Sequence, residues 1–88
     1  MRWVIYMSEV PLSALPRGSR ALVVSIRGGR GLVNRLMQMG ITPGTIIEVL
    51  DNTAGPIMIR VRGVTIALGR GVASKIFVRP YPHIPYPY

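Results

Sequence analysis

Five short stretches of the chain carry the hydrophobic pattern of β-strands. The first, residues 21–26, is rich in β-branched residues, and its imperfect alternation at Val24 and Ser25 indicates a β-bulge. In the others, apolar and polar residues alternate, as in strands that bury one face. They are residues 45–50, 57–61, 65–69 and 75–79, with a tight reversal at Arg62-Gly63.

One helix is predicted between the first two strands. Apolar residues fall at Leu32, Leu36 and Met39, which is the spacing of one helix face. Gly40 occupies the position where a left-handed residue ends a helix, and Pro43-Gly44 prevents the helix from continuing. A helix of about eight residues is not stable alone. We therefore expect it to cover one end of the sheet through its three apolar residues.

These elements predict one domain with a mainly β fold. The chain has 88 residues, and ten glycines and eight prolines divide it into short pieces. About five strands are too few for a sandwich and fit a small, partly open barrel, with one short α-helix inserted after the first strand. The residues expected in the core of this barrel are Ile26, Ile47, Val49, Ile59, Val61, Ile66, Leu68, Ile76 and Val78.

The two ends of the chain differ from the domain, which we place at residues 12–79. We assign residues 1–11 to a leader. Within and just after it, we expect a loop or a single turn at residues 10–16. Residues 80–88 form a tail rich in proline and tyrosine, where alternating prolines favour polyproline II. In this tail, Pro82 and Pro85 lie three residues apart and follow a basic residue, which is the spacing found in peptides that bind SH3 domains. We also expect this tail to support weak association between copies of the chain.

Composition argues against catalysis and against a bound metal. The chain has no cysteine, one histidine and three acidic residues, which are scattered along the sequence. Cysteine nucleophiles and thiolate metal sites are thereby excluded, and no acid–base pair is evident. His83 has no nearby ligands, and the methionines beside the helix are better explained by packing. We expect no enzyme activity, no metal site and no cofactor.

The charge is strongly positive. Lysine and arginine together number 11, which gives a formal net charge of +8. No stretch approaches the roughly 18 apolar residues of a membrane span, and the apolar start of the chain is too short for a signal peptide. We expect a cytoplasmic protein whose basic surface meets an acidic partner or contacts an anionic membrane surface peripherally.

Two local patterns bear on nucleotide or nucleic-acid binding. Residues 27–31, Arg-Gly-Gly-Arg-Gly, resemble both an RNA-binding box and a phosphate loop, but the third glycine and the lysine of the known loops are missing, which favours a plain turn. Arg60, Arg62, Lys75 and Arg79 alternate outward with Phe77 among them. Such a basic surface with an aromatic can bind nucleic acid, or it can match an acidic protein. Nucleic acid is the less favoured alternative.

Residues 32–45, Leu-Val-Asn-Arg-Leu-Met-Gln-Met-Gly-Ile-Thr-Pro-Gly-Thr, carry a family resemblance. In this segment, together with Gly55-Pro56 and the closing residues 64–70, the chain resembles the ferrous iron transport protein A family, or FeoA-like domain. The resemblance extends over residues 12–79. It implies an SH3-like β-barrel with a helical insertion, located in the cytoplasm and without enzyme activity.

The resemblance also implies a partner. Proteins of this family are thought to act with FeoB, the membrane ferrous-iron permease that carries a cytosolic GTPase domain, and a similar domain mediates interactions in iron-dependent repressors. We therefore expect an accessory or regulatory interaction module that docks on the cytosolic part of such a permease. A transcription-regulatory interaction module is the alternative. The expected docking residues are Arg30, Arg35, Met37, Gln38, Arg60, Arg62 and Phe77.

Overall fold

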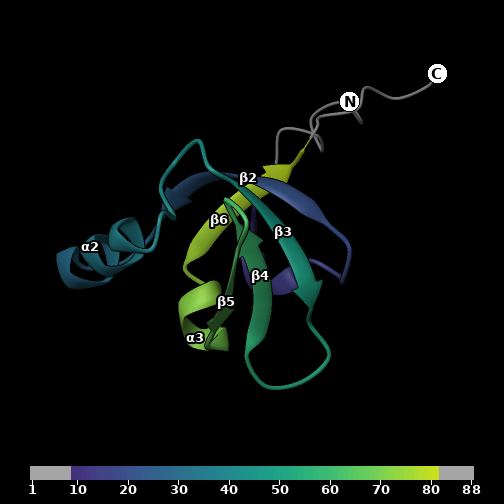
Figure 1. The fold of residues 1–88 in the computed structure, drawn as a ribbon. Helices are drawn as coiled ribbons and strands as arrows, with labels where there is room; N and C mark the ends of the chain where they lie inside the picture. The colour runs from purple at the N-terminus through teal and green to yellow at the C-terminus, as the bar shows by residue number, and fades with distance from the viewer. Residues whose placement is uncertain (1–8, 82–88) are drawn as a thin grey trace.

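Six antiparallel strands form one sheet in the order β1-β6-β2-β3-β4-β5 (Figure 1). The structure, a computed structural model, describes residues 9–81. The strands are β1 (Val10–Pro11), β2 (Arg20–Ile26), β3 (Ile46–Asp51), β4 (Ile57–Val61), β5 (Val64–Leu68) and β6 (Ile76–Pro80). The helices are the short 3-10 helix η1 (Leu12–Ala14), α2 (Arg30–Gln38) and α3 (Arg70–Ala73). Because the strand order is linear, β1 and β5 are edge strands and the described sheet does not close into a barrel.

The predicted mainly β fold is confirmed, with additions at both ends of the domain. The five predicted strands correspond to β2 through β6, and α2 follows the first of them. Residues 10–11, assigned to the leader, pair with β6 as β1, and the connection between β5 and β6 contains the short helix α3. Pairing also continues past the predicted boundary, since the Tyr81 N–H donates to the Arg20 carbonyl at 2.9 Å. The tail prolines Pro82 and Pro85 and leader residues 1–8 lie outside the described residues.

Two β-bulges bend the sheet. The pairing of β2 with β6 shifts between Val23 and Ser25, where the sequence indicated a bulge. The pairing of β3 with β4 shifts between Val49 and Asp51, which the sequence did not indicate. A bulge bends its strand and increases the local twist. The sheet is therefore strongly curved (Figure 1).

A tight hairpin joins β4 to β5 at Arg62-Gly63. The backbone φ angles of these two residues are 52° and 80°. Two-residue hairpin loops favour positive φ at both positions because this geometry matches the twist of the flanking strands. Among the described residues, Arg62 is the one non-glycine residue with a positive φ. The hairpin thus directs an arginine outward at the end of β4.

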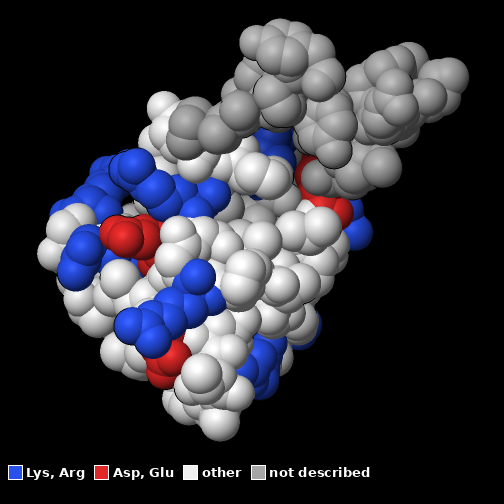
Figure 2. Space-filling view, turned by 90° about the vertical axis from the view of Figure 1, so that its right-hand side faces the viewer, with Lys and Arg blue, Asp and Glu red and all other residues white. Residues whose placement is uncertain are grey.

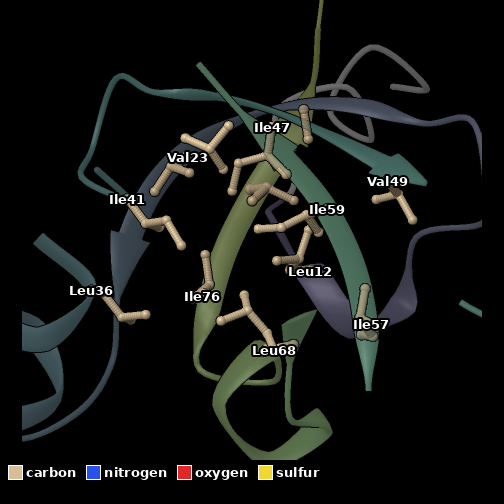
Figure 3. Close-up of a cluster of buried hydrophobic side chains, with 14 residues drawn as sticks. Leu12, Val23, Leu36, Ile41, Ile47, Val49, Ile57, Ile59, Leu68 and Ile76 are labelled. Carbon is tan, nitrogen blue, oxygen red and sulfur yellow. The ribbon is translucent and has the colours of Figure 1, made fainter. Parts of the chain in front are cut away.

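Side chains on the inner side of the sheet form one buried cluster (Figure 3). The expected core residues found there are Ile47, Val49, Ile59, Val61, Leu68, Ile76 and Val78. Ile26 and Ile66 are only partly buried and pack against the cluster. Leu12 of η1, Ile41 after α2 and Ile57 of β4 also belong to it and are fully buried. The core therefore draws residues from the connections as well as from the strands.

The C-terminal end of α2 differs in one respect from the prediction. Gly40 has the expected left-handed φ of 85°, and its N–H donates to the Met37 carbonyl at 2.9 Å. The Ile41 N–H donates to the Leu36 carbonyl at 2.9 Å, which completes a Schellman motif. This reversal directs Ile41 into the core beside Leu36, whereas Met39 is 36% exposed. The expectation that Met39 covers the sheet was wrong, because Met39 lies just beyond the last helical residue, Gln38, and its side chain is exposed.

Asn52 joins three segments that are distant in the sequence. Its side-chain amide donates to the carbonyls of Ser13 and Leu15, at 3.1 and 2.6 Å. Its side-chain oxygen accepts a hydrogen bond from Arg70 at 2.6 Å. The loop after β3 is thereby tied both to the η1 segment and to the first residue of α3.

The Leu36→Ala substitution should lower the free energy of unfolding by about 2–5 kcal/mol, because it removes a buried side chain and leaves a cavity. The adjacent Met37→Ala is the matched control, because Met37 is 54% exposed. The control should change stability by no more than about 0.5 kcal/mol. Urea unfolding followed by circular dichroism measures both values, and equal losses would show that Leu36 does not fasten α2 to the core.

The Asn52→Ala substitution should lower the free energy of unfolding by about 1–3 kcal/mol, because the two carbonyls lose their donor. Asn34→Ala, at an exposed position of α2, is the control and should leave stability unchanged or slightly raised, since alanine favours helix. Urea unfolding also measures the stability of these two variants. An unchanged free energy of unfolding for Asn52→Ala would mean that water replaces all three hydrogen bonds without cost.

Candidate docking surface

Four of the predicted docking residues lie on α2, which is positioned at one side of the sheet (Figure 1). Arg30, Arg35, Met37 and Gln38 are all exposed, and we call them the α2 surface. The helix is fastened by Leu36, which is 1% exposed, and by partial burial of Leu32. Because so little of α2 is buried, most of its circumference is open to a partner. The turn predicted at residues 27–31 is shorter in the structure: the chain bends at Gly28, Gly29 caps the helix without a side-chain hydrogen bond, and Arg30 and Gly31 are the first helical residues.

Arg60 and Arg62 lie in a groove on the outer side of the sheet. The groove has a volume of about 430 Å³. We call it the arginine groove, and it is lined by Arg20, Gly44, Thr45, Ile46, Glu48, Arg60, Arg62 and Gly63. The lining thus contains three positive side chains and one carboxylate. Basic side chains gather on the outer surface of the molecule, with acidic side chains among them (Figure 2).

The strand register creates this arrangement. Arg20 of β2 lies opposite Glu48 of β3, which lies opposite Arg60 of β4. Because Ala21 and Ile47 point into the core, their neighbours Arg20 and Glu48 point outward. The Arg60 guanidinium donates to Glu48 Oε1 at 3.4 Å, with both side chains partly exposed. Arg20, Glu48 and Arg60 therefore form a row across three strands in which the charge is positive, negative and positive.

The α2 surface and the arginine groove adjoin each other. A Cβ atom placed on Gly40, just beyond α2, would lie 4.0 Å from the Arg62 Cδ atom. The Thr45 hydroxyl, which lies in the groove lining, donates to the Gly40 carbonyl at 3.2 Å. These contacts bring the end of the helix next to the β4–β5 hairpin. A single partner can therefore touch both features.

Phe77 lies outside both the α2 surface and the arginine groove. It belongs to β6, which is separated from β4 by β2 and β3, or about 14 Å at the usual strand spacing. The Arg27 guanidinium lies over its ring, 3.7 Å from the ring centroid, and also approaches Glu9 at 3.8 Å. This cation–π contact covers one face of the ring. The aromatic and the groove arginines, which the sequence suggested as one nucleic-acid platform, thus form two separate features.

Arg20 and Glu48 are site residues that the sequence analysis missed. The signal was present, since Arg20 precedes the first predicted strand and Glu48 is the one charged residue of residues 45–50. Their meeting depends on the pairing of β2 with β3. Alternation alone does not specify which residues lie opposite each other.

Neither a metal centre nor a membrane span is found among residues 9–81. No three histidine, cysteine, aspartate or glutamate side chains of this range gather where they could hold an ion. No helix of the range is long and apolar enough to cross a membrane.

Comparison with known proteins agrees with this description. Residues 10–80 match the family model of the FeoA domain. A protein of Methanocaldococcus jannaschii, whose name assigns it to Fe(2+) transport as transport protein A, is 41% identical over 68 residues, which cover 77% of this chain and 83% of that protein. The crystal structure of an iron uptake regulatory protein, FeoA, is 44% identical and has a TM-score of 0.77, covering 83% of this chain and 97% of that one.

The fold is also shared more widely. A manganese-dependent transcriptional repressor matches 82% of this chain and 41% of its own length, with a TM-score of 0.75 at 24% identity, which shows likeness of fold alone. The fold and the site thus define a small SH3-like β domain with an exposed helix and a basic groove. The chain belongs to the FeoA family, whose proteins are involved in Fe(2+) transport.

The Glu48→Gln substitution should lower the free energy of unfolding by no more than about 1 kcal/mol. Its ion pair with Arg60 is 40–49% exposed, and surface pairs of this kind contribute little after solvent screening. Urea unfolding at low and high salt measures the difference, which should shrink as salt is added. A loss above about 2 kcal/mol would instead show that the pair maintains the strand register.

Proposed function

We propose that this protein is a cytoplasmic accessory and regulatory protein of ferrous iron uptake. In this proposal it has no catalytic activity and acts by docking on the cytosolic part of a FeoB-type membrane permease. Membership of a family involved in Fe(2+) transport supports the process. The observation that supports docking is the exposed α2 surface, which adjoins a groove lined by three arginines.

The physical case for docking rests on exposure and charge. Met37 is 54% exposed, and it lies on a helix with two exposed arginines and no acidic residue. Aromatic residues, methionine and arginine are enriched at protein interfaces, where a few such side chains carry most of the binding energy. The net charge of +8 would speed encounter with an acidic partner beneath an anionic membrane.

The Arg35→Glu substitution on α2 should weaken binding to the isolated cytosolic part of the permease at least about tenfold, because it reverses a charge at the interface. Arg17→Glu carries the same charge change on the exposed loop before β2 and is the matched control. The control should stay within about threefold of the wild type. Titration calorimetry at about 50 mM salt measures all three affinities.

Two results would contradict the proposal. The first is the absence of wild-type binding at low salt, where electrostatic steering is strongest. The second is an equal weakening by Arg17→Glu and Arg35→Glu, which would show attraction to the net charge without a defined α2 interface.

A further inference from the structure

The arginine groove contains more positive charge than its own residues neutralise. Its one carboxylate, Glu48, accepts from Arg60 at 3.4 Å. Arg20 and Arg62 are exposed, and among residues 9–81 neither forms an ion pair. The groove therefore has two uncompensated guanidinium groups, Arg20 opposite Glu48 on β2 and Arg62 in the hairpin two residues beyond Arg60.

We propose that the arginine groove binds an extended acidic peptide segment of a protein partner, with one carboxylate on Arg20 and a second on Arg62. The inference rests on the proposed function, because the segment would belong to the permease. Guanidinium groups suit this role, since their planar fork can hold a carboxylate through two parallel hydrogen bonds. Arg60 contributes by pairing with the Glu48 carboxylate, which is the one acidic group of the groove lining.

The charge order of the groove favours a peptide over a uniform polyanion. Arg20, Glu48 and Arg60 lie opposite one another on three neighbouring strands, about 4.8 Å apart. A continuous phosphate backbone that crossed this row would place a negative charge on Glu48. A peptide avoids that repulsion because it can carry carboxylates at two positions and a neutral or basic residue between them.

The dimensions also fit a short extended segment. Arg20 and Arg62 lie on the two sides of β3, and Arg62 is two residues beyond Arg60, which is level with Arg20, so their backbones are about 12 Å apart. An extended chain rises about 3.3 Å per residue and covers this distance in about four residues. Gly44 and Gly63 line the groove without side chains, and a Cβ atom on either would meet nothing within 4 Å. Half-buried Ile46 gives the segment an apolar contact.

A peptide titration with the full chain tests the inference. The probe is a fluorescein-labelled octapeptide of alternating Asp and Ser, and the matched control peptide has Asn in place of Asp. Fluorescence polarisation at about 50 mM salt should show binding of the Asp peptide and at least tenfold weaker binding of the Asn peptide. Failure of the Asp peptide to bind, or equal binding of both peptides, would overturn the inference.

Paired variants locate the binding site. The double variant Arg20→Gln/Arg62→Asn should weaken binding of the Asp peptide at least tenfold; asparagine is chosen because it tolerates the positive φ of Arg62. Arg17→Gln/Lys75→Gln removes the same charge at exposed positions outside the groove and should stay within about threefold of the wild type. Urea unfolding of each variant verifies that it is folded. Equal weakening by both doubles would overturn the inference, because binding would then follow net charge alone.

Two further titrations distinguish a peptide site from a phosphate site and this inference from the proposed function. An oligothymidine of eight nucleotides that bound more tightly than the Asp peptide, and lost binding in the groove variant, would make the groove a phosphate site and overturn the peptide inference. With the permease's cytosolic part, wild-type binding that the groove variant retains in full would also overturn the inference, while the proposed function stands. Absence of wild-type binding to the permease with intact binding of the Asp peptide would refute the proposed function alone.

Discussion

The curvature of one sheet around one buried cluster is the constraint on which the rest of this structure depends. A single sheet has no second layer to cover its apolar side, so the strands must bend and the connections must supply the missing cover. The bulges after Val23 and Val49 bend the sheet. Leu12 and Ile41, from a 3-10 helix and from the segment after α2, supply cover. Every strand residue that points away from this cluster is then available for other contacts.

The same constraint explains why α2 is both firmly attached and widely exposed. Leu36 and Ile41 enter the core side by side because the Schellman motif reverses the chain between them. These two buried residues fasten the helix at its C-terminal end, and the partly buried Leu32 packs against the core from its first turn. The attachment also fixes the helix beside Arg62, which itself is directed by the left-handed hairpin. The two features proposed for docking are thus positioned by backbone geometry.

The scarcity of acidic residues shapes the surface. Glu9 and Glu48 each approach an arginine, and Asp51 accepts from the Thr53 hydroxyl. With 11 basic residues in the chain, these carboxylates leave most of the positive charge uncompensated. A surface with this charge attracts acidic groups.

The sequence by itself determined the strands, the helix and its end at Gly40, because alternation, helical spacing and a left-handed glycine act over a few residues. It also determined most of the core, since inward strand positions are readable from alternation. Only the tertiary structure decided that Ile41 replaces Met39 in the core and that Phe77 lies apart from the groove. The grouping of Arg20, Glu48 and Arg60 likewise depended on strand order and register. These are set by the packing of the whole sheet, which no local pattern encodes.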